Sequence, residues 1–239
     1  MITASPAPLN QTTDARLALV RPLFGAGISL GAANPLGALP DPFPQERACL
    51  SPSAVEKRRR EFAAGRAAAH RAMQDLGRAP CPIVIAKSRA PIWPKGLTGS
   101  ITHTHSCALA AVTSIQTRRA IGIDVEEDTP LKDDLRPAIC SAREQDWLTS
   151  QDNPGQMAKL IFSAKEAAYK CQYTVSEQFF GFDGMELEIE PEEVGETVRR
   201  GRFVAAFTAD RPPFLTGARI NGAYVIGEGI IFTAASLEA

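Results

Sequence analysis

Three carboxylates and one ammonium group occur at spacings that could bring them together on two neighbouring elements. Asp124 and Glu126 are two residues apart in a run of alternating isoleucine and valine, which predicts a strand with both carboxylates on one face. Glu166 and Lys170 are four residues apart in a predicted helix that begins at Asn153-Pro154, so they also share a face. If strand and helix pack together, these oxygen ligands suit Mg²⁺, which keeps open positions for water and phosphate groups.

Each half of this pattern also has a simpler interpretation. An Asp-Val-Glu-Glu-Asp run after a strand is most often a solvated acidic loop. A Glu and a Lys four residues apart on a helix most often form a surface ion pair, which contributes roughly 0.3–0.5 kcal/mol. The occurrence of both halves in this order is what favours a site.

A second group is basic and lies on a helix predicted from residue 53 to about residue 76. Arg58 and Arg66 flank Phe62 at helical spacing, so two guanidinium groups would share a face and could bind a phosphate monoester. The alternatives are a solvated basic helix end and a nucleic-acid patch.

A third group surrounds the strand that begins Gly-Ser-Ile-Thr-His and ends at Thr102 and His103. Lys87 and Arg89 precede it by a loop and could also meet a nucleotide. The loop has no Walker A pattern. A lone histidine at such a place is most often a surface residue.

Composition restricts the class of protein. The chain has 239 residues, of which 44% are hydrophobic and 22% charged, as expected of a globular protein with one large domain or two small ones. The net charge of −1 implies no nucleic-acid partner, so phosphate binding must come from local cations. Five cysteines without a CxxC pair indicate reduced thiols. With no signal-peptide pattern and no apolar run long enough to span a membrane, we expect a cytoplasmic protein.

Two short repeats predict a duplication. The segment starting at Phe62 (Phe-Ala-Ala-Gly-Arg-Ala-Ala) matches the one starting at Phe162 (Phe-Ser-Ala-Lys-Glu-Ala-Ala), and Gly27-Ile-Ser-Leu-Gly matches Gly122-Ile-Asp-Val-Glu. We therefore expect an α+β chain built from two similar α/β halves, residues 1–117 and 118–239. The first half lacks the carboxylates, so one metal site is expected. Residues 1–24 read as a loose lead-in, and residues after 176 as β-rich.

The order Gly-Ile-Asp-x-Glu and then Phe-Ser-x-Lys-Glu-Ala-x-x-Lys resembles the Sfp-type 4′-phosphopantetheinyl transferases, and more closely the enterobactin-synthetase component D branch. The resemblance runs from about Ser53 to the C-terminus. It implies a pseudo-dimer of two α+β halves with the active site between them. It also implies Mg²⁺-dependent transfer of phosphopantetheine from coenzyme A to a serine of an apo acyl or peptidyl carrier protein, with release of 3′,5′-ADP.

The resemblance also implies roles for individual residues. Asp124, Glu126 and Glu166 would hold the metal, and Lys170 would offset phosphoryl charge. Glu166, directly or through a metal-bound water, would take the serine proton. Arg58 and Arg66 would meet the 3′-phosphate. The full set expected to contact coenzyme A is Arg58, Arg66, Lys87, Arg89, Thr102, His103, Lys165 and Lys170. His105 has no counterpart in the family.

Several alternatives remain open at this stage. A metal-dependent nucleotide phosphodiesterase would hydrolyse nucleotides without a protein acceptor, and a coenzyme A-binding module would not turn over. The carrier could belong to siderophore, polyketide or fatty-acid synthesis, and the metal could be Mg²⁺ or Mn²⁺. A monomer is expected, because the second half takes the place of a partner subunit. Aromatic residues at 169–180 form either core or a docking surface for the carrier.

Overall fold

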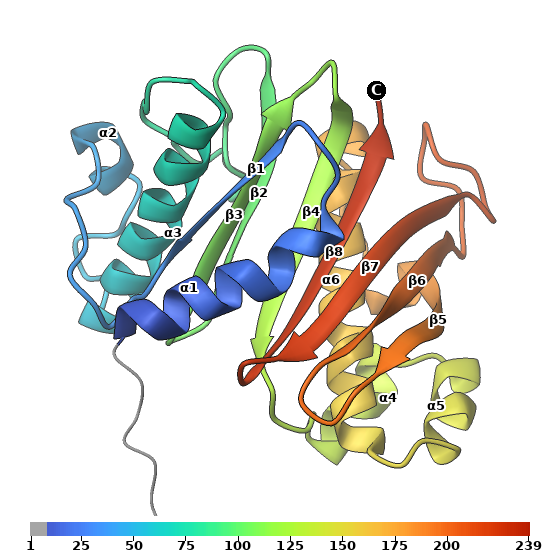
Figure 1. Ribbon diagram of the computed structural model, residues 1–239. Coiled ribbons are helices and arrows are strands. Elements are labelled where there is room, and N and C mark those ends of the chain that lie inside the picture. Colours follow the sequence, from blue (N-terminus) through green and yellow to red (C-terminus); the bar gives the residue numbers. More distant parts are fainter. Residues whose placement is uncertain (1–8) are drawn as a thin grey trace, which may run out of the picture.

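The computed structural model describes residues 9–239, and the first eight residues of the predicted lead-in lie outside the described residues. The rest of the lead-in is not loose. Helix α1 (Leu9–Val20) and the single turn η1 (Arg21–Leu23) lie across the molecule, and α1 packs on strands from both ends of the chain. In Figure 1, α1 crosses in front of the strands. No described helix combines the length and apolarity that a membrane crossing needs.

The first half is a three-stranded antiparallel sheet with one long helix on it. Its strands are β1 (Ile28–Ala33), β2 (Leu97–His103) and β3 (Ala108–Ser114), in the order β1-β3-β2. Helix α3 (Glu56–Asp75) packs on this sheet through a run of buried alanines, and the short helix α2 (Pro44–Arg47) precedes it. Small side chains let helix and sheet approach closely, so little space remains between them.

The second half is larger, with five antiparallel strands in the order β4-β8-β7-β6-β5. They are β4 (Arg118–Glu127), β5 (Met185–Val194), β6 (Arg199–Phe207), β7 (Arg219–Gly227) and β8 (Ile230–Glu238). Helix α6 (Pro154–Ser176) covers one face of this sheet (Figure 1). The connections contain η2 (Asp133–Leu135), α4 (Arg136–Ile139), α5 (Ala142–Thr149) and η3 (Phe182–Gly184).

The two halves meet where β2 lies beside β4. The hydroxyls of Ser100 and Thr102 on β2 accept the backbone N–H groups of Ile123 and Val125 on β4, each at 3.1 Å. Buried side chains of both sheets share one apolar cluster along this seam. The α+β architecture of two α/β halves is therefore confirmed. We propose that the boundary falls between residues 117 and 118, in the turn that joins β3 to β4.

Two glycines show how the duplication is registered. A Cβ on Gly31 of β1 would lie 2.0 Å from the carbonyl oxygen of Ala68 on α3, and a Cβ on Gly122 of β4 would lie 1.9 Å from that of Ala167 on α6. Each half therefore has its helix against a strand that only glycine allows. The counterpart of Gly122 is thus Gly31. The sequence repeat had predicted Gly27, which was wrong. On the helices, Lys165 and not Glu166 becomes the counterpart of Arg66.

A buried glutamate repeats in the same way. Glu46 of α2 accepts the backbone N–H groups of Phe43 and Ile83, both at 2.9 Å. Glu144 of α5 accepts those of Ser141 at 2.7 Å and Leu187 at 2.8 Å. Each glutamate thus closes the start of its own short helix and ties it to a distant segment, because a buried carboxylate needs donors for its oxygens.

Some local predictions were wrong. Helix α3 begins at Glu56 with no side-chain cap, later than the predicted start at residue 53, and Val55 is 68% exposed. The segment around Ile85 forms a single bridge to Pro91. The region predicted to be β-rich after residue 176 ends in two strands, β7 and β8. They are divided by a tight turn in which residues 228 and 229 have positive φ angles.

Candidate active site

The close approach of α6 to β4 at Gly122 sets the geometry of the site. Alternation along β4 directs Val125 into the apolar cluster at the seam and turns Asp124 and Glu126 to the face that α6 covers. The predicted sharing of one face is therefore confirmed, since both carboxylates meet lysines of α6. Asp124 pairs with Lys170, and Glu126 pairs with Lys159.

Asp124 is 5% exposed and its two oxygens differ. Oδ1 accepts the hydroxyl of Thr102 at 3.1 Å and the ammonium of Lys170 at 2.6 Å. Lys170 also donates to the carbonyl of Ile123 at 3.2 Å. Oδ2 is buried and has no hydrogen-bond partner. A buried carboxylate oxygen without a donor is costly, so this atom is suited to a cation or a ligand donor.

The other two carboxylates are half-buried. Burial raises the pKa of Glu126, and the charge of Asp124 raises it further, against the lowering effect of Lys159 at 3.2 Å. Burial also raises the pKa of Glu166; Lys170 opposes this, and Asp124 and Glu126 add to it. Glu166 makes no hydrogen bond or ion pair with any described residue. The three carboxylates therefore lie within electrostatic reach of one another.

These residues fit a divalent cation by donor chemistry and charge. In the described part of the chain, no three His, Cys, Asp or Glu side chains are gathered tightly enough to hold a metal as they stand. Ammonium groups pair with two of the carboxylates, Lys170 with Asp124 and Lys159 with Glu126. Hard carboxylate oxygens, one of them the buried and unpartnered Oδ2 of Asp124, are nevertheless the donors that Mg²⁺ prefers. Lys159 was not predicted from the sequence, although its position two helical turns before Glu166 was a usable signal.

Basic residues of the first half, Arg58 and His103, reach the same place. His103 at the end of β2 lies with Nε2 3.0 Å from a guanidinium nitrogen of Arg58 on α3. Because arginine can only donate, Nε2 accepts and Nδ1 carries the proton. Nδ1 lies 3.9 Å from Glu61, which the sequence interpretation also missed. Burial lowers the pKa of His103, and the positive charge of Arg58 lowers it further, so the ring is neutral at pH 7. Lys170 also lowers this pKa, whereas Asp124 raises it.

Arg66 is buried on the next turns of α3, at 5% exposure. Its guanidinium carbon lies 4.4 Å from the centre of the Phe62 ring, and its Nε is 3.9 Å from Glu46. Burial lowers the pKa of Arg66, and the charge of Glu46 counteracts this. The guanidinium makes no hydrogen bond with any described residue, and its Nε is fully buried. A buried guanidinium with free donors is suited to an anion.

Lys165 differs from its counterpart Arg66. Its ammonium lies 2.8 Å from Glu144 and donates to the carbonyls of Ile139 at 2.8 Å and Phe182 at 3.0 Å. All three N–H groups are therefore used, and the residue is 3% exposed. This geometry argues against the coenzyme A contact predicted for Lys165.

Two other predicted contacts remain apart from the cluster. Lys87 and Arg89 are exposed on the turn beside the Ile85–Pro91 bridge, where Arg89 has a positive φ of 71°. No described interaction links them to Arg58 or His103. His105, which had no predicted role, pairs with Glu127 at 3.1 Å.

An aromatic group borders Glu166 on the outer side of α6. The ring of Tyr169 lies within 6.0 Å of the rings of Tyr173, Phe179 and Phe180. Phe180 is buried in the core, whereas Phe179 is 84% exposed. A cavity of about 150 Å³ lies here. Its lining residues are Lys165, Glu166, Tyr169, Phe179, Phe180, Gly181, Phe182 and Met185. Of the two alternatives for these aromatic residues, core or docking surface, Phe180 belongs to the core, and Phe179 is exposed and available for docking.

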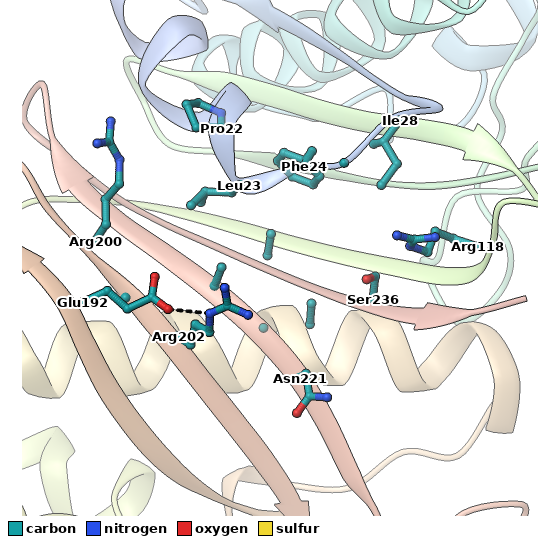
Figure 2. A pocket seen from close by; sticks show the side chains of 16 residues that line it. Pro22, Leu23, Phe24, Ile28, Arg118, Glu192, Arg200, Arg202, Asn221 and Ser236 are labelled. Atoms are coloured by element: carbon teal, nitrogen blue, oxygen red, sulfur yellow. Dashed lines mark hydrogen bonds and ion pairs between the residues drawn. The ribbon is translucent and has the colours of Figure 1, made fainter.

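A larger hollow of about 340 Å³ lies elsewhere, on the face of the five-stranded sheet away from α6 (Figure 2). Its rim carries Arg118, Arg200 and Arg202, each paired with a glutamate, and its wall includes Phe24. None of the predicted site residues lines it. We place the chemistry at Asp124, Glu126 and Glu166, because the unpaired carboxylate of Glu166 and the buried Oδ2 of Asp124, which has no partner, are there.

Comparison with known proteins covers both halves of the chain. The family model described as "4′-phosphopantetheinyl transferase N-terminal domain" matches residues 45–113. The model of the "4′-phosphopantetheinyl transferase superfamily" matches residues 120–212. Neither match includes the described helix α1.

Curated relatives give the same result over longer spans. The 4′-phosphopantetheinyl transferase Npt of Nocardia iowensis is 34% identical over 77% of this chain and 85% of its own length. The 4′-phosphopantetheinyl transferase PptT of Mycobacterium tuberculosis is 31% identical over 81% of this chain and 85% of its own length. Enterobactin synthase component D of Salmonella typhi is 39% identical, over 49% of this chain and 50% of its own length.

Proposed function

The chain belongs to the 4′-phosphopantetheinyl transferase superfamily, and on that basis we propose that it moves 4′-phosphopantetheine from coenzyme A to a serine of an apo carrier protein. The reaction releases 3′,5′-ADP and depends on Mg²⁺. The enzyme is a monomer, because the second half takes the place of a partner subunit. It acts in the cytoplasm and does not bind nucleic acid.

One observation carries this proposal. Arg58 and the neutral His103 of the first half lie together at the seam between β2 and β4, where the charges of Asp124 and Lys170 of the second half act on His103. Asp124 and Lys170 act in turn on Glu166. A substrate with several phosphate groups needs cations for its terminal charge and a metal site for its pyrophosphate. The seam supplies both kinds of group.

Binding of coenzyme A begins with its phosphates. Arg66 offers a buried guanidinium with free donors and receives the 3′-phosphate together with Arg58. His103 and Lys170 lie towards the pyrophosphate. The cation would be held by Asp124, Glu126 and Glu166, and when bound it supplies positive charge that offsets the charge of the pyrophosphate.

The transfer itself needs a proton acceptor. The serine oxygen forms a bond to the phosphorus attached to pantetheine, the bond from that phosphorus to the leaving phosphate oxygen breaks, and 3′,5′-ADP leaves. Glu166 accepts the serine proton. Its carboxylate makes no hydrogen bond or ion pair with any described residue and lines the cavity beside Tyr169, so an incoming serine could reach it directly or through a metal-bound water.

The carrier protein docks on the aromatic group beside Glu166. Phe179 is 84% exposed and borders the cavity that Glu166 also lines, so an apolar partner surface would cover it. A serine delivered from this side reaches Glu166 first.

The test is incubation of the enzyme with coenzyme A, Mg²⁺ and a panel of apo carriers from siderophore, polyketide and fatty-acid synthesis, read by intact mass. We expect one carrier class to gain a single phosphopantetheine. Excess chelator should abolish the gain, and Mn²⁺ in place of Mg²⁺ shows the metal preference. Full transfer in chelator would refute the metal assignment.

A further inference from the structure

The hydroxyl of Thr102 is used twice inside the protein. Oγ1 accepts the backbone N–H of Val125 and donates to Oδ1 of Asp124, both at 3.1 Å, and the residue is 5% exposed. We propose that Thr102 is a positioning residue that presents Asp124 to the cation, and that it does not contact coenzyme A. The proposal rests on the proposed function, in which Asp124 is a metal ligand.

The direction of the hydroxyl proton follows from its partners. Because a backbone N–H can only donate, Oγ1 must accept from Val125, and its own proton is left for the carboxylate. Lys170 also donates to Oδ1, at 2.6 Å. Two donors therefore hold Oδ1, and the buried Oδ2 remains without a partner. Together they fix the rotation of the carboxylate and leave one defined oxygen for the cation.

This geometry leaves the hydroxyl of Thr102 no proton for coenzyme A. A threonine hydroxyl has one proton, and Asp124 takes it. Contact with the cofactor would require the hydroxyl to leave a buried carboxylate and a buried backbone N–H, each of which would then lack a partner. The neighbouring His103 is the half-exposed polar residue of this strand and can meet the pyrophosphate.

Thr102 also joins the halves functionally. It lies on β2 of the first half, while Asp124 lies on β4 of the second, so the orientation of a metal ligand depends on how the two halves meet. Ser100 is a matched control on the same strand. Its hydroxyl accepts the N–H of Ile123 at the same distance of 3.1 Å, is also buried, and makes no described contact with a carboxylate.

The experiment compares Thr102→Val, Thr102→Ser and Ser100→Ala with the wild-type enzyme. Binding of Mn²⁺ without coenzyme A is measured by titration calorimetry, and kcat and KM for coenzyme A are measured separately. A hydrogen bond to a charged group corresponds to about 10–100-fold in an equilibrium constant. We therefore expect Thr102→Val to weaken Mn²⁺ binding by about 10-fold or more and to lower kcat, with KM for coenzyme A within about 2-fold of wild type.

Thr102→Ser should restore metal binding, because it keeps the hydroxyl. Ser100→Ala should bind Mn²⁺ as the wild type does, although it loses the same kind of seam bond. If Thr102→Val does not fold, Thr102→Ala takes its place. A raised KM for coenzyme A with unchanged Mn²⁺ binding would overturn the proposal. So would an equal loss in Ser100→Ala, which would reduce Thr102 to packing of the seam.

The metal titration also separates this proposal from the proposed function. If the wild type modifies no carrier but Thr102→Val weakens Mn²⁺ binding, the transferase assignment fails and the positioning role stands. If the wild type transfers phosphopantetheine and Thr102→Val binds Mn²⁺ normally, the positioning role alone fails.

Discussion

Replacement of Arg66 by methionine should separate substrate binding from stability. The methionine keeps an unbranched apolar stem beside the Phe62 ring and removes only the guanidinium. The guanidinium makes no hydrogen bond with any described residue, so its loss breaks none, and the ion contact that it loses with Glu46 is a long one of 3.9 Å. Glu46 keeps its bonds from Phe43, Ile83 and His70, each at 2.9 Å. We therefore expect the free energy of unfolding of Arg66→Met to lie within about 1 kcal/mol of the wild-type value.

The effect on substrate use should be large. A charge-assisted hydrogen bond to a phosphate contributes roughly 1.5–3 kcal/mol, so kcat/KM for coenzyme A should fall about 10–100-fold. Dephospho-coenzyme A lacks the 3′-phosphate, and its kcat/KM should fall by less than about 3-fold, because the contact is already missing.

Lys165→Met is the matched control, because Lys165 is the counterpart of Arg66 in the second half. Here the ammonium is paired with Glu144 at 2.8 Å and buried at 3% exposure. Removing one partner of a buried pair costs about 3–5 kcal/mol, so this variant should lose Tm on the order of 10 °C. Its ratio of coenzyme A to dephospho-coenzyme A use should stay that of the wild type.

The assay is carrier modification with each substrate, followed by intact mass, together with thermal unfolding of each variant. Equal losses of kcat/KM on coenzyme A and dephospho-coenzyme A in Arg66→Met would contradict the 3′-phosphate assignment. A Tm loss in Arg66→Met as large as that in Lys165→Met would show that the Arg66–Glu46 and Lys165–Glu144 pairs have the same structural role.

Other expectations can be checked on single variants. Glu166→Gln should raise the Tm of the metal-free enzyme at pH 7–8. The pKa of this buried carboxyl group is raised in the folded protein, so its contribution to stability is complete below the pKa of the unfolded state and is lost as pH rises through the pKa of the folded state. A gain in Tm that persists at pH 3 would contradict this. Phe179→Ser should raise KM for the carrier and leave Tm and KM for coenzyme A unchanged, with the exposed Ile115→Ser as control; an unchanged carrier KM would remove Phe179 from the docking surface. Gly122→Ala should unfold the protein or separate α6 from β4, because the new Cβ would lie 1.9 Å from a carbonyl oxygen; wild-type Tm and activity would show that the helix can shift at little cost.

Local periodicity was enough to predict the frame of the site. Alternation along residues 121–126 placed Asp124 and Glu126 on one face, and helical spacing placed Glu166 and Lys170 together. These rules depend on chain geometry alone, so tertiary packing did not alter them. The start of α6 at Pro154 was confirmed for the same reason.

Contacts between distant segments could not be predicted in this way. The pair of Lys159 with Glu126, the burial of Lys165 against Glu144 and the bond from Thr102 to Asp124 depend on how helix, strand and half-domain meet. A sequence pattern shows which side chains share a face, and it does not show which partner lies opposite.

The repeat was predicted correctly in kind but was wrong in register. Short matches around Gly27 and Phe62 followed residue identity, whereas the structure follows close approach, which requires glycine at 31 and 122. Helix α1 was missed because its apolar residues form no clear stripe and the segment holds neither an acidic first turn nor a basic last turn.

The most direct test of the central claim is release of 3′,5′-ADP from coenzyme A and Mg²⁺, with and without an apo carrier. We predict slow release with coenzyme A alone, a sharp rise with the carrier, one phosphopantetheine gained per carrier, and a return to the slow rate when the acceptor serine of the carrier is changed to alanine. Fast release that is indifferent to any carrier would contradict the transferase account and identify a nucleotide hydrolase in its place.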